Sequence, residues 1–399
     1  MRNLRLPGMA EATRLTREGR LGEAMALIQR AVRGGPAAET HAEPHAEPGA
    51  RPGPVRLPPP DAAPPAGPAH RFKPADFKPA DFMPADLQET LREALREVGR
   101  KVGPLFEGVT EPAPRPRPDS EPGRFLDLSF ANAEGQRAYK LYVPSGYDGR
   151  PVPLVLMLHG CTQNPDDFAA GTGMNGVAEA ETFLVAYPAQ TAAANHARCW
   201  NWFVTADQRR DQGEAALIAG IARAVMAEYA VDAARVYVAG LSAGGAAAAN
   251  LAAAYPDLFA AVGIHSGLCA GAAHDLPSAL RAMRQGGEGG APLRDPLPTI
   301  VFHGDQDGTV HPRNGEAIIA ATGATPLREE AGVSSGGRAW RRSILADRRG
   351  RPAHEHWVVE GSGHAWSGGT AAGSYTDPQG PDAAREMWRF FREHPKPRR

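Results

Sequence analysis

The segment Val236–Gly245 holds one serine, Ser242, between glycines in the order Gly-x-Ser-x-Gly. β-branched and aromatic residues precede it and an alanine-rich run follows, a pattern typical of a buried strand, a tight turn and a helix. In such a turn a strained backbone lifts the serine hydroxyl out of the sheet, and the glycines let the strand and helix approach closely. The pattern therefore predicts a nucleophilic serine, provided that its chemical partners occur later in the chain.

A serine hydroxyl becomes a nucleophile when a histidine removes its proton and a buried carboxylate orients that histidine. Two acidic residues, Asp305 and Asp307, follow one apolar segment, and His364 follows a later one. We favour Asp307 as the carboxylate because it lies further into the loop, where Val310 could anchor it, and we expect Asp305 to brace the turn. The order serine, aspartate, histidine is one in which hydrolases arrange a catalytic triad.

Three further histidines, His303, His311 and His354, are alternatives to His364 as the base. His303 lies beside a predicted strand end, where we expect it to bond to the backbone. Only His364 combines a glycine-rich setting with the last strand of the predicted sheet. We therefore prefer His364 as the group that removes the serine proton.

The negative oxygen that develops during acyl transfer requires two backbone N–H donors. One should be the N–H of Ala243, directly after the serine, and the other should come from the loop that follows the apolar segment 154–158. We assign the second donor to Cys161, with Gly160 letting the chain turn inward. Cys161 could instead be a nucleophile itself, but no cysteine–histidine pair is needed once Ser242 has its partners.

These residues need a scaffold that gathers strand ends, and the apolar pattern predicts one. Two segments alternate apolar and polar residues, as antiparallel edge strands do, whereas later ones include the continuous apolar runs of buried parallel strands. Helical segments separate them, so we expect a doubly wound, mostly parallel α/β sheet that binds ligands at its carboxyl ends. The strands are predicted at 125–130, 137–143, 154–158, 183–187, before Ser242, and at 260–264, 299–302 and 356–359, with helices at 214–230, after Ser242 and at 382–393.

The composition of the first 123 residues differs from that of the remainder, which predicts two parts, 1–123 and 124–399. Residues 8–33 have the spacing of a helical hairpin, 34–86 form a Pro/Ala-rich tract expected to be disordered, and an amphipathic helix follows at 87–98. We expect this leader to dock on a partner or an apolar surface. Phenylalanines recur in its tract at Phe72, Phe77 and Phe82.

Charge and hydropathy argue against several classes of protein. The chain of 399 residues has a formal net charge of −1, whereas a general nucleic-acid binder needs a strongly basic face. No run of apolar residues is long enough to predict a membrane span. The amino terminus lacks the apolar core of a secretory signal, so we expect a cytoplasmic location. The predicted chemistry implies no metal and no organic cofactor.

Six short motifs follow one another along the chain. They are LHGCTQ at 158–163, CWNWF at 199–203, DQGE at 211–214, GLSAGG at 240–245, HGDQD at 303–307 and GHAW at 363–366. As an ordered set they resemble the poly(3-hydroxybutyrate) depolymerase-type esterases of the α/β-hydrolase superfamily, which have feruloyl and acetylxylan esterase relatives. The resemblance implies an α/β-hydrolase fold, the triad Ser242, Asp307 and His364, and hydrolysis of carboxylic esters through an acyl-enzyme. The implied substrate is a poly- or oligo(3-hydroxybutyrate)-like polyester.

The same resemblance implies a disulfide between Cys161 and Cys199. Such a bond conflicts with a cytoplasmic location, because cytoplasmic thiols are normally reduced, and an extracellular location is therefore the alternative. Three functions are alternatives to a polyesterase. They are a feruloyl- or acetylxylan-type esterase, a serine peptidase of the prolyl-oligopeptidase type, and a granule-surface binding protein whose hydrolase domain is idle.

Aromatic residues near the motifs are candidates for contact with the substrate. We interpret Trp200, Trp202 and Trp366 as an aromatic wall for an acyl chain, with His159 beside them. Buried tryptophans can also simply fill a core, and for Trp202 the two interpretations are equally supported.

Overall fold

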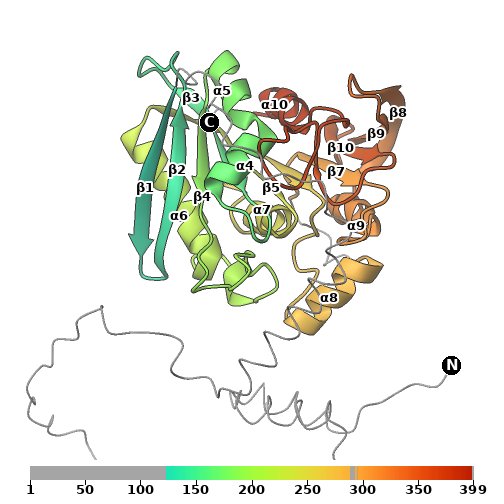
Figure 1. Ribbon diagram of the computed structural model, residues 1–399, viewed down its shortest axis with the longest axis horizontal. Coiled ribbons are helices and arrows are strands. Elements are labelled where there is room, and N and C mark those ends of the chain that lie inside the picture. The colour runs from blue at the N-terminus through green and yellow to red at the C-terminus, as the bar shows by residue number, and fades with distance from the viewer. Residues whose placement is uncertain (1–122, 288–292, 294, 398–399) are drawn as a thin grey trace, which may run out of the picture. The chain divides into compact units, whose positions relative to one another are not determined.

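A computed structural model of the chain describes residues 123–287, 293 and 295–397 (Figure 1). The hairpin, the Pro/Ala-rich tract and the amphipathic helix expected in the leader lie outside these residues. The boundary between residues 123 and 124 therefore stays a prediction. Among the described residues no helix is long and apolar enough to cross a membrane.

A sheet of ten strands forms the centre of the described part, in the order β1-β2-β4-β3-β5-β6-β7-β10-β9-β8. The strands from β4 to β10 in this order run parallel, and the pairs at either edge are antiparallel. The strands are β1 Arg124–Asn132, β2 Gly135–Val143, β3 Val152–Leu158, β4 Leu184–Pro188, β5 Val231–Leu241, β6 Ala261–His265, β7 Thr299–Gly304, β8 Thr325–Val333, β9 Ala339–Ala346 and β10 Pro352–Val359.

Helices cover both faces of the sheet, as the alternation of strands and helices predicted (Figure 1). α6, α7, α8 and α9 contribute to one apolar core, and α4, α5 and α10 contribute to the other. The sequence of β3 is a continuous apolar run because the strand is buried on both faces. Leu156 faces the first core and Met157 faces the second. The helices are α4 Pro165–Thr172, α5 Met174–Glu181, α6 Gly213–Glu228, α7 Ala243–Ala254, α8 Leu276–Gln285, α9 Arg313–Thr322 and α10 Ala383–Glu393.

The sheet extends further than the sequence analysis expected. The strand at 356–359 is the last of this sheet along the chain, as predicted, but β8 and β9, which precede it in the chain, were not predicted and continue the sheet beyond β10 as antiparallel strands. β8 escaped prediction because it is an edge strand that is mostly exposed and carries three charged residues in its sequence TPLREEAGV. Its pattern lacks the alternation that marks a half-buried strand.

Candidate active site

Ser242 occupies the turn between β5 and α7, with φ 58° and ψ −120°, a strained conformation for a residue with a side chain. Its N–H donates to the carbonyl oxygen of His265 at 2.9 Å. The flanking positions have no room for a side chain, because a Cβ on Gly244 would lie 2.1 Å from the carbonyl oxygen of Leu158. A Cβ on Gly240 would lie 2.4 Å from the backbone of Gly244. The geometry is that of a nucleophile elbow.

Asp307 and His364, which follow β7 and β10, are joined by a hydrogen bond. His364 Nδ1–H donates to Asp307 Oδ2 at 2.8 Å, and Asp307 Oδ1 accepts the N–H of Thr309 at 2.9 Å and of Val310 at 2.8 Å. Burial alone would raise the pKa of Asp307, but the bonds from His303, His364 and the Val310 N–H hold it well below its usual range. The carboxylate is therefore ionised and held in one orientation.

Asp305 has a separate role in the same loop. Its Oδ1 accepts the N–H of Gly361 at 2.7 Å, which connects the β7 loop to the loop that carries His364. His303 bonds to the backbone, with Nε2 lying 2.8 Å from the carbonyl oxygen of Val310 and 3.4 Å from Asp307 Oδ2. The bracing by Asp305 and the backbone bond of His303 are as predicted.

The three candidate residues share one edge of the sheet, because β5, β7 and β10 are part of the parallel set. With Nδ1–H donating to Asp307, the Nε2 of His364 is left to accept a proton. Among the described residues no hydrogen bond joins Ser242 Oγ to His364. Catalytic bonds of this kind commonly tighten only when substrate is bound.

The turn after β3 passes beside the serine, where a Cβ on Gly160 would lie 3.6 Å from the Cβ of Ser242. Gln163 closes this turn, because its side-chain oxygen accepts the Gly160 N–H at 2.9 Å. The N–H groups of Cys161 and Ala243 have no hydrogen-bond acceptor among the described residues. Both predicted donors are thus available to an incoming oxygen atom.

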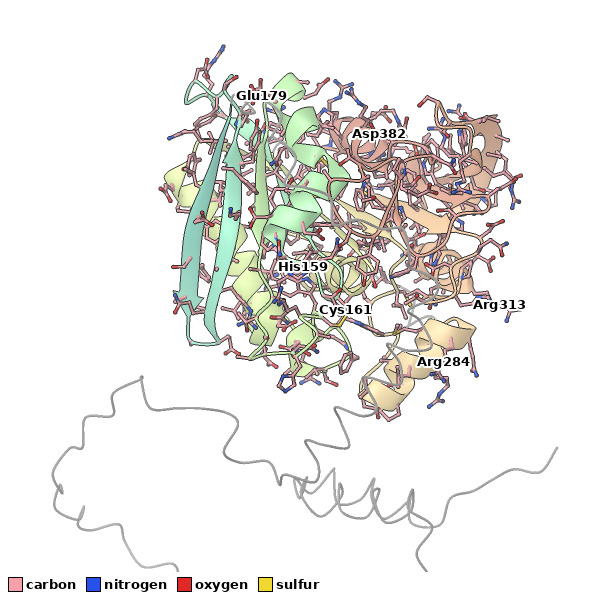
Figure 2. The ribbon with its side chains drawn as sticks, in the orientation of Figure 1. His159, Cys161, Glu179, Arg284, Arg313 and Asp382 are labelled. Atoms are coloured by element: carbon pink, nitrogen blue, oxygen red, sulfur yellow. A yellow bond between two sulfur atoms is a disulfide. The ribbon has the colours of Figure 1, made fainter. Side chains whose placement is uncertain are left out.

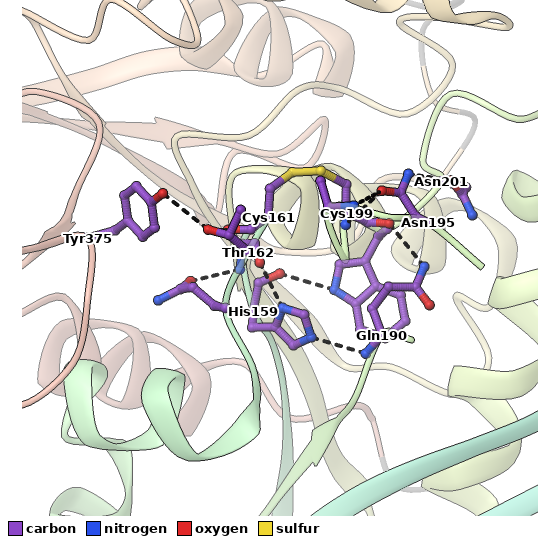
Figure 3. Close-up of a disulfide and its surroundings, with 12 residues drawn as sticks. His159, Cys161, Thr162, Gln190, Asn195, Cys199, Asn201 and Tyr375 are labelled. Carbon is purple, nitrogen blue, oxygen red and sulfur yellow. Dashed lines mark hydrogen bonds between the residues drawn. A yellow bond between two sulfur atoms is a disulfide. The ribbon is translucent and has the colours of Figure 1, made fainter. Parts of the chain in front are cut away.

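A disulfide joins Cys161 to Cys199, as the family resemblance implied (Figure 3). The alternative in which Cys161 is the nucleophile is therefore wrong, because its sulfur is already bonded. Disulfides persist mainly in oxidising compartments. The bond supports the extracellular alternative over the cytoplasmic location expected from the amino terminus.

Burial contradicts the predicted aromatic wall. Trp200 is 0% and Trp366 is 1% exposed, so neither side chain can line an open acyl site. Trp200 donates from Nε1 to the His159 carbonyl oxygen at 3.1 Å, and Trp366 lies against Phe168 and the ring of His265. Trp202 is 6% exposed and part of the first core. The three tryptophans therefore fill the space between loops at the strand ends, where the backbone must be rigid.

His159 is also internal rather than a contact for substrate. Burial lowers its pKa to about 4, so the ring is neutral. Its Nδ1–H then donates to the carbonyl oxygen of Gly160 at 2.7 Å, while Nε2 accepts the N–H of Gln190 at 3.1 Å. Both ring nitrogens are used to shape the turn. Figure 2 shows His159 and Cys161 close together, in the part of the domain away from Glu179 and Asp382.

Two buried polar residues next to this site were not predicted from the sequence. His265, the last residue of β6, accepts the N–H of Ser367 at Nε2 at 2.9 Å and stacks on Trp366. Glu214, at the start of α6, binds the loop that carries Cys199. The signals were present, because His265 follows an apolar strand and Glu214 belongs to the DQGE motif. Among the described residues no cluster of three or more histidine, cysteine or acidic side chains could hold a metal ion.

Comparison with known proteins agrees with this geometry. An acetyl xylan esterase from Aspergillus awamori superposes with a TM-score of 0.54 at 19% identity, over 67% of this chain and 99% of that chain. This likeness and the elbow at the end of β5 define an α/β-hydrolase fold.

Sequence similarity shows which α/β-hydrolases this chain resembles. Residues 137–321 match the sequence model of the family described as Esterase PHB depolymerase. The poly(3-hydroxyalkanoate) depolymerase C of Paucimonas lemoignei is 32% identical over 250 residues, which are 59% of this chain and 60% of that protein. Feruloyl esterase B of Thermothelomyces thermophilus is 28% identical over 231 residues, which are 52% of this chain and 77% of that protein. Within the matched region the chain is therefore similar to the poly(3-hydroxybutyrate) depolymerase-type esterases. The chain spans only 60% of the length of the depolymerase.

Proposed function

We propose that this protein is a serine hydrolase of carboxylic esters. The hydrogen bond of 2.8 Å between Asp307 and His364, at the sheet edge that presents the elbow serine, carries the proposal. In this reaction Ser242 Oγ attacks the ester carbonyl carbon while its proton passes to His364 Nε2. The negative oxygen accepts the N–H groups of Cys161 and Ala243.

The rest of the cycle uses the same groups. The tetrahedral intermediate collapses, the bond to the leaving oxygen breaks, and the alcohol takes the proton from His364. Water then attacks the acyl-enzyme, gives its proton to His364, and releases the carboxylic acid with Ser242 restored. Asp307 stabilises the positive imidazolium in both halves of the cycle, because its carboxylate is ionised and fixed.

The proposed substrate is a poly- or oligo(3-hydroxybutyrate)-like polyester. The identity of 32% to a poly(3-hydroxyalkanoate) depolymerase supports this choice. A feruloyl- or acetylxylan-type esterase is the second candidate, and the similarity to feruloyl esterase B favours it. Purified protein assayed on hydroxybutyrate oligomers, a feruloyl ester, acetylated xylan and a peptide amide separates these functions and the peptidase alternative.

The control for that panel is Ser242→Ala. We expect this variant to lose hydrolysis of p-nitrophenyl butyrate and of every natural ester that the wild-type protein cleaves. Substantial turnover by Ser242→Ala would contradict the proposed function. A wild-type protein that binds polyester granules but cleaves none of these esters would support the idle-domain alternative instead.

The proposed place of action is an oxidising compartment, supported by the Cys161–Cys199 bond. Within it, the leader of residues 1–123 is proposed to dock the enzyme on an apolar surface. Co-sedimentation of Ser242→Ala with polyester granules, compared with the same variant shortened to residues 124–399, tests the docking. Equal sedimentation of the two proteins would count against it.

A further inference from the structure

Glu214 is a buried carboxylate outside the triad that gathers donors from one loop. It is 6% exposed and accepts the main-chain N–H of Asn201 at 2.7 Å and the side-chain Nδ2–H at 2.9 Å. The side-chain amide of Gln190 donates to it as well. Arg137 supplies the nearest positive charge, with Nη2 at 3.6 Å. Glu214 therefore holds two points of the segment from residue 190 to residue 201.

That segment lies directly against the turn that presents the Cys161 N–H. The main-chain N–H of Gln190 donates to His159 Nε2 at 3.1 Å, and its side-chain Nε2–H reaches the carbonyl oxygen of Cys199 at 3.0 Å. Trp200 donates to the carbonyl oxygen of His159 at 3.1 Å. The Cys161–Cys199 bond adds a covalent link between the two loops (Figure 3).

Asn195 provides a second connection between the segment of residues 190–201 and the turn that presents the Cys161 N–H. Its Oδ1 accepts the N–H of Ala197 at 3.0 Å and of Cys199 at 3.3 Å, while its Nδ2–H donates to Asn201 Oδ1 at 3.0 Å. The N–H of Thr162, the residue after Cys161, donates in turn to the Ala197 carbonyl oxygen at 2.6 Å. Figure 3 shows Asn195 and Asn201 beside Cys199, at the disulfide that leads to the turn.

We propose that Glu214 is a positioning residue that fixes the oxyanion-binding N–H of Cys161 through Gln190, Asn201 and the disulfide-linked loop. This inference deepens the proposed function and depends on it. An oxyanion donor works only when it lies about 2.7–3.1 Å from the developing negative oxygen, so a small displacement of the turn weakens transition-state binding. The substrate itself does not touch Glu214.

A role in stability alone does not account for this carboxylate. Burial raises the pKa of Glu214, with nearby Asp207 acting in the same direction, and the bonds from Gln190 and Asn201 and the charge of Arg137 do not fully offset this. A carboxyl pKa that is higher in the folded state means that ionising Glu214 lowers stability as the pH rises. Both oxygens of this carboxyl group nevertheless face N–H donors of a loop that must be exact in position.

The test replaces Glu214 by glutamine and compares it with Glu179→Gln. Glu179 is a matched control, because it also accepts several donors, including Tyr142 Oη at 2.7 Å and the Ser145 N–H at 3.0 Å, but lies away from Cys161 (Figure 2). For Glu214→Gln we expect kcat on p-nitrophenyl butyrate to fall about 10- to 100-fold with KM within about twofold of wild type. Glu179→Gln should leave kcat unchanged.

Phenylboronic acid gives a readout that a purely structural role would not move. It forms a tetrahedral adduct with an active-site serine, so its inhibition constant should rise for Glu214→Gln by the same factor as kcat/KM falls. Asn195→Ala leaves Glu214 in place and removes the second connection, and it should lower kcat about 5-fold. This variant decides the question if Glu214→Gln does not fold.

Each outcome has one meaning. Wild-type kcat in folded Glu214→Gln, or a rise in KM alone, overturns the proposal, and so does unchanged kcat in Asn195→Ala when Glu214→Gln is unfolded. An equal loss of kcat in Glu179→Gln also overturns it, because the effect would then be general. Activity in Ser242→Ala would refute the proposed function itself, a result that is read independently of these variants.

Discussion

Separate replacement of Asp307 and Asp305 by asparagine distinguishes the carboxylate that supports the base from the one that braces the turn. Asp307→Asn keeps the size of the side chain, and an amide oxygen can still accept the N–H groups of Thr309 and Val310. The atom that faces His364 Nδ1–H would then be an NH₂ group, which cannot accept that proton. His364 must turn or change tautomer, and the imidazolium loses its counter-charge.

We expect the kcat values of the two variants to differ by several orders of magnitude. Removing the charge from a triad aspartate lowers kcat about 10⁴-fold, and we expect this loss for Asp307→Asn. Asp305→Asn keeps an oxygen that can accept the Gly361 N–H, so we expect kcat within about threefold of wild type and a stability change near or below about 1 kcal/mol.

The assay is hydrolysis of p-nitrophenyl butyrate by both variants, with thermal unfolding recorded beside it to show that each protein is folded. The reasoning is refuted if Asp305→Asn is the inactive variant and Asp307→Asn retains turnover. Equal and moderate losses in both variants would refute it as well, because the structure gives only Asp307 a bond to His364.

Unfolding at several pH values provides an independent check on Asp307. Because its pKa is depressed in the folded protein, the ionised carboxylate contributes stability that is fully present above the ordinary aspartate pKa of about 3.9 and is lost as the pH falls below it. The stability difference between wild type and Asp307→Asn should therefore shrink in acid below about pH 4. A difference that is constant from neutral pH to pH 3 would contradict the assignment.

Three other variants test neighbouring parts of the site. Replacing Cys161 and Cys199 by serine opens a bond across 38 residues and should lower stability by about 4 kcal/mol by loop entropy, visible as a fall in Tm, and kcat should fall with it. Gly315→Ala places a Cβ 2.8 Å from His356 Nε2 and 3.2 Å from His303 Nδ1, and this overpacking should lower stability by about 1–3 kcal/mol in denaturant unfolding. Gly244→Ala puts its Cβ 2.1 Å from the Leu158 carbonyl oxygen, so we expect no active folded protein in an esterase assay after size exclusion.

Much of the site could be predicted from the sequence because its chemistry is local. Ser242 lies in a turn whose glycines are fixed by short-range contacts, so the sequence around it is diagnostic. The preference for Asp307 over Asp305 came from its place further into the loop and from the position of Val310, and in the structure the Val310 N–H donates to Asp307. The parallel strands were recognisable because burial on both faces produces uninterrupted apolar runs.

Features set by distant contacts were not predictable in the same way. β8 is held mainly by its pairing with β9, so its own sequence carries little signal of a strand. The tryptophans belong to matched motifs, yet whether an indole faces a cleft or a core depends on what packs over it. Trp366 is covered by Phe168 and His265, residues about 200 and 100 positions earlier in the chain.

The difference between local sequence signals and distant contacts also explains why the triad was predicted from the sequence and Glu214 was not. A nucleophile, a base and a carboxylate have characteristic residue types, and their order in the chain can be compared with known chemistry. Glu214 belongs to the matched DQGE motif, but its residue type does not reveal a role, because an acidic residue at a helix start is normally read as favourable to the helix. Its importance follows from the donors that face it, which belong to a loop 13 to 24 residues earlier. If Glu214 does fix the Cys161 N–H, the precision of this active site depends on a carboxyl group whose residue type alone does not reveal its role.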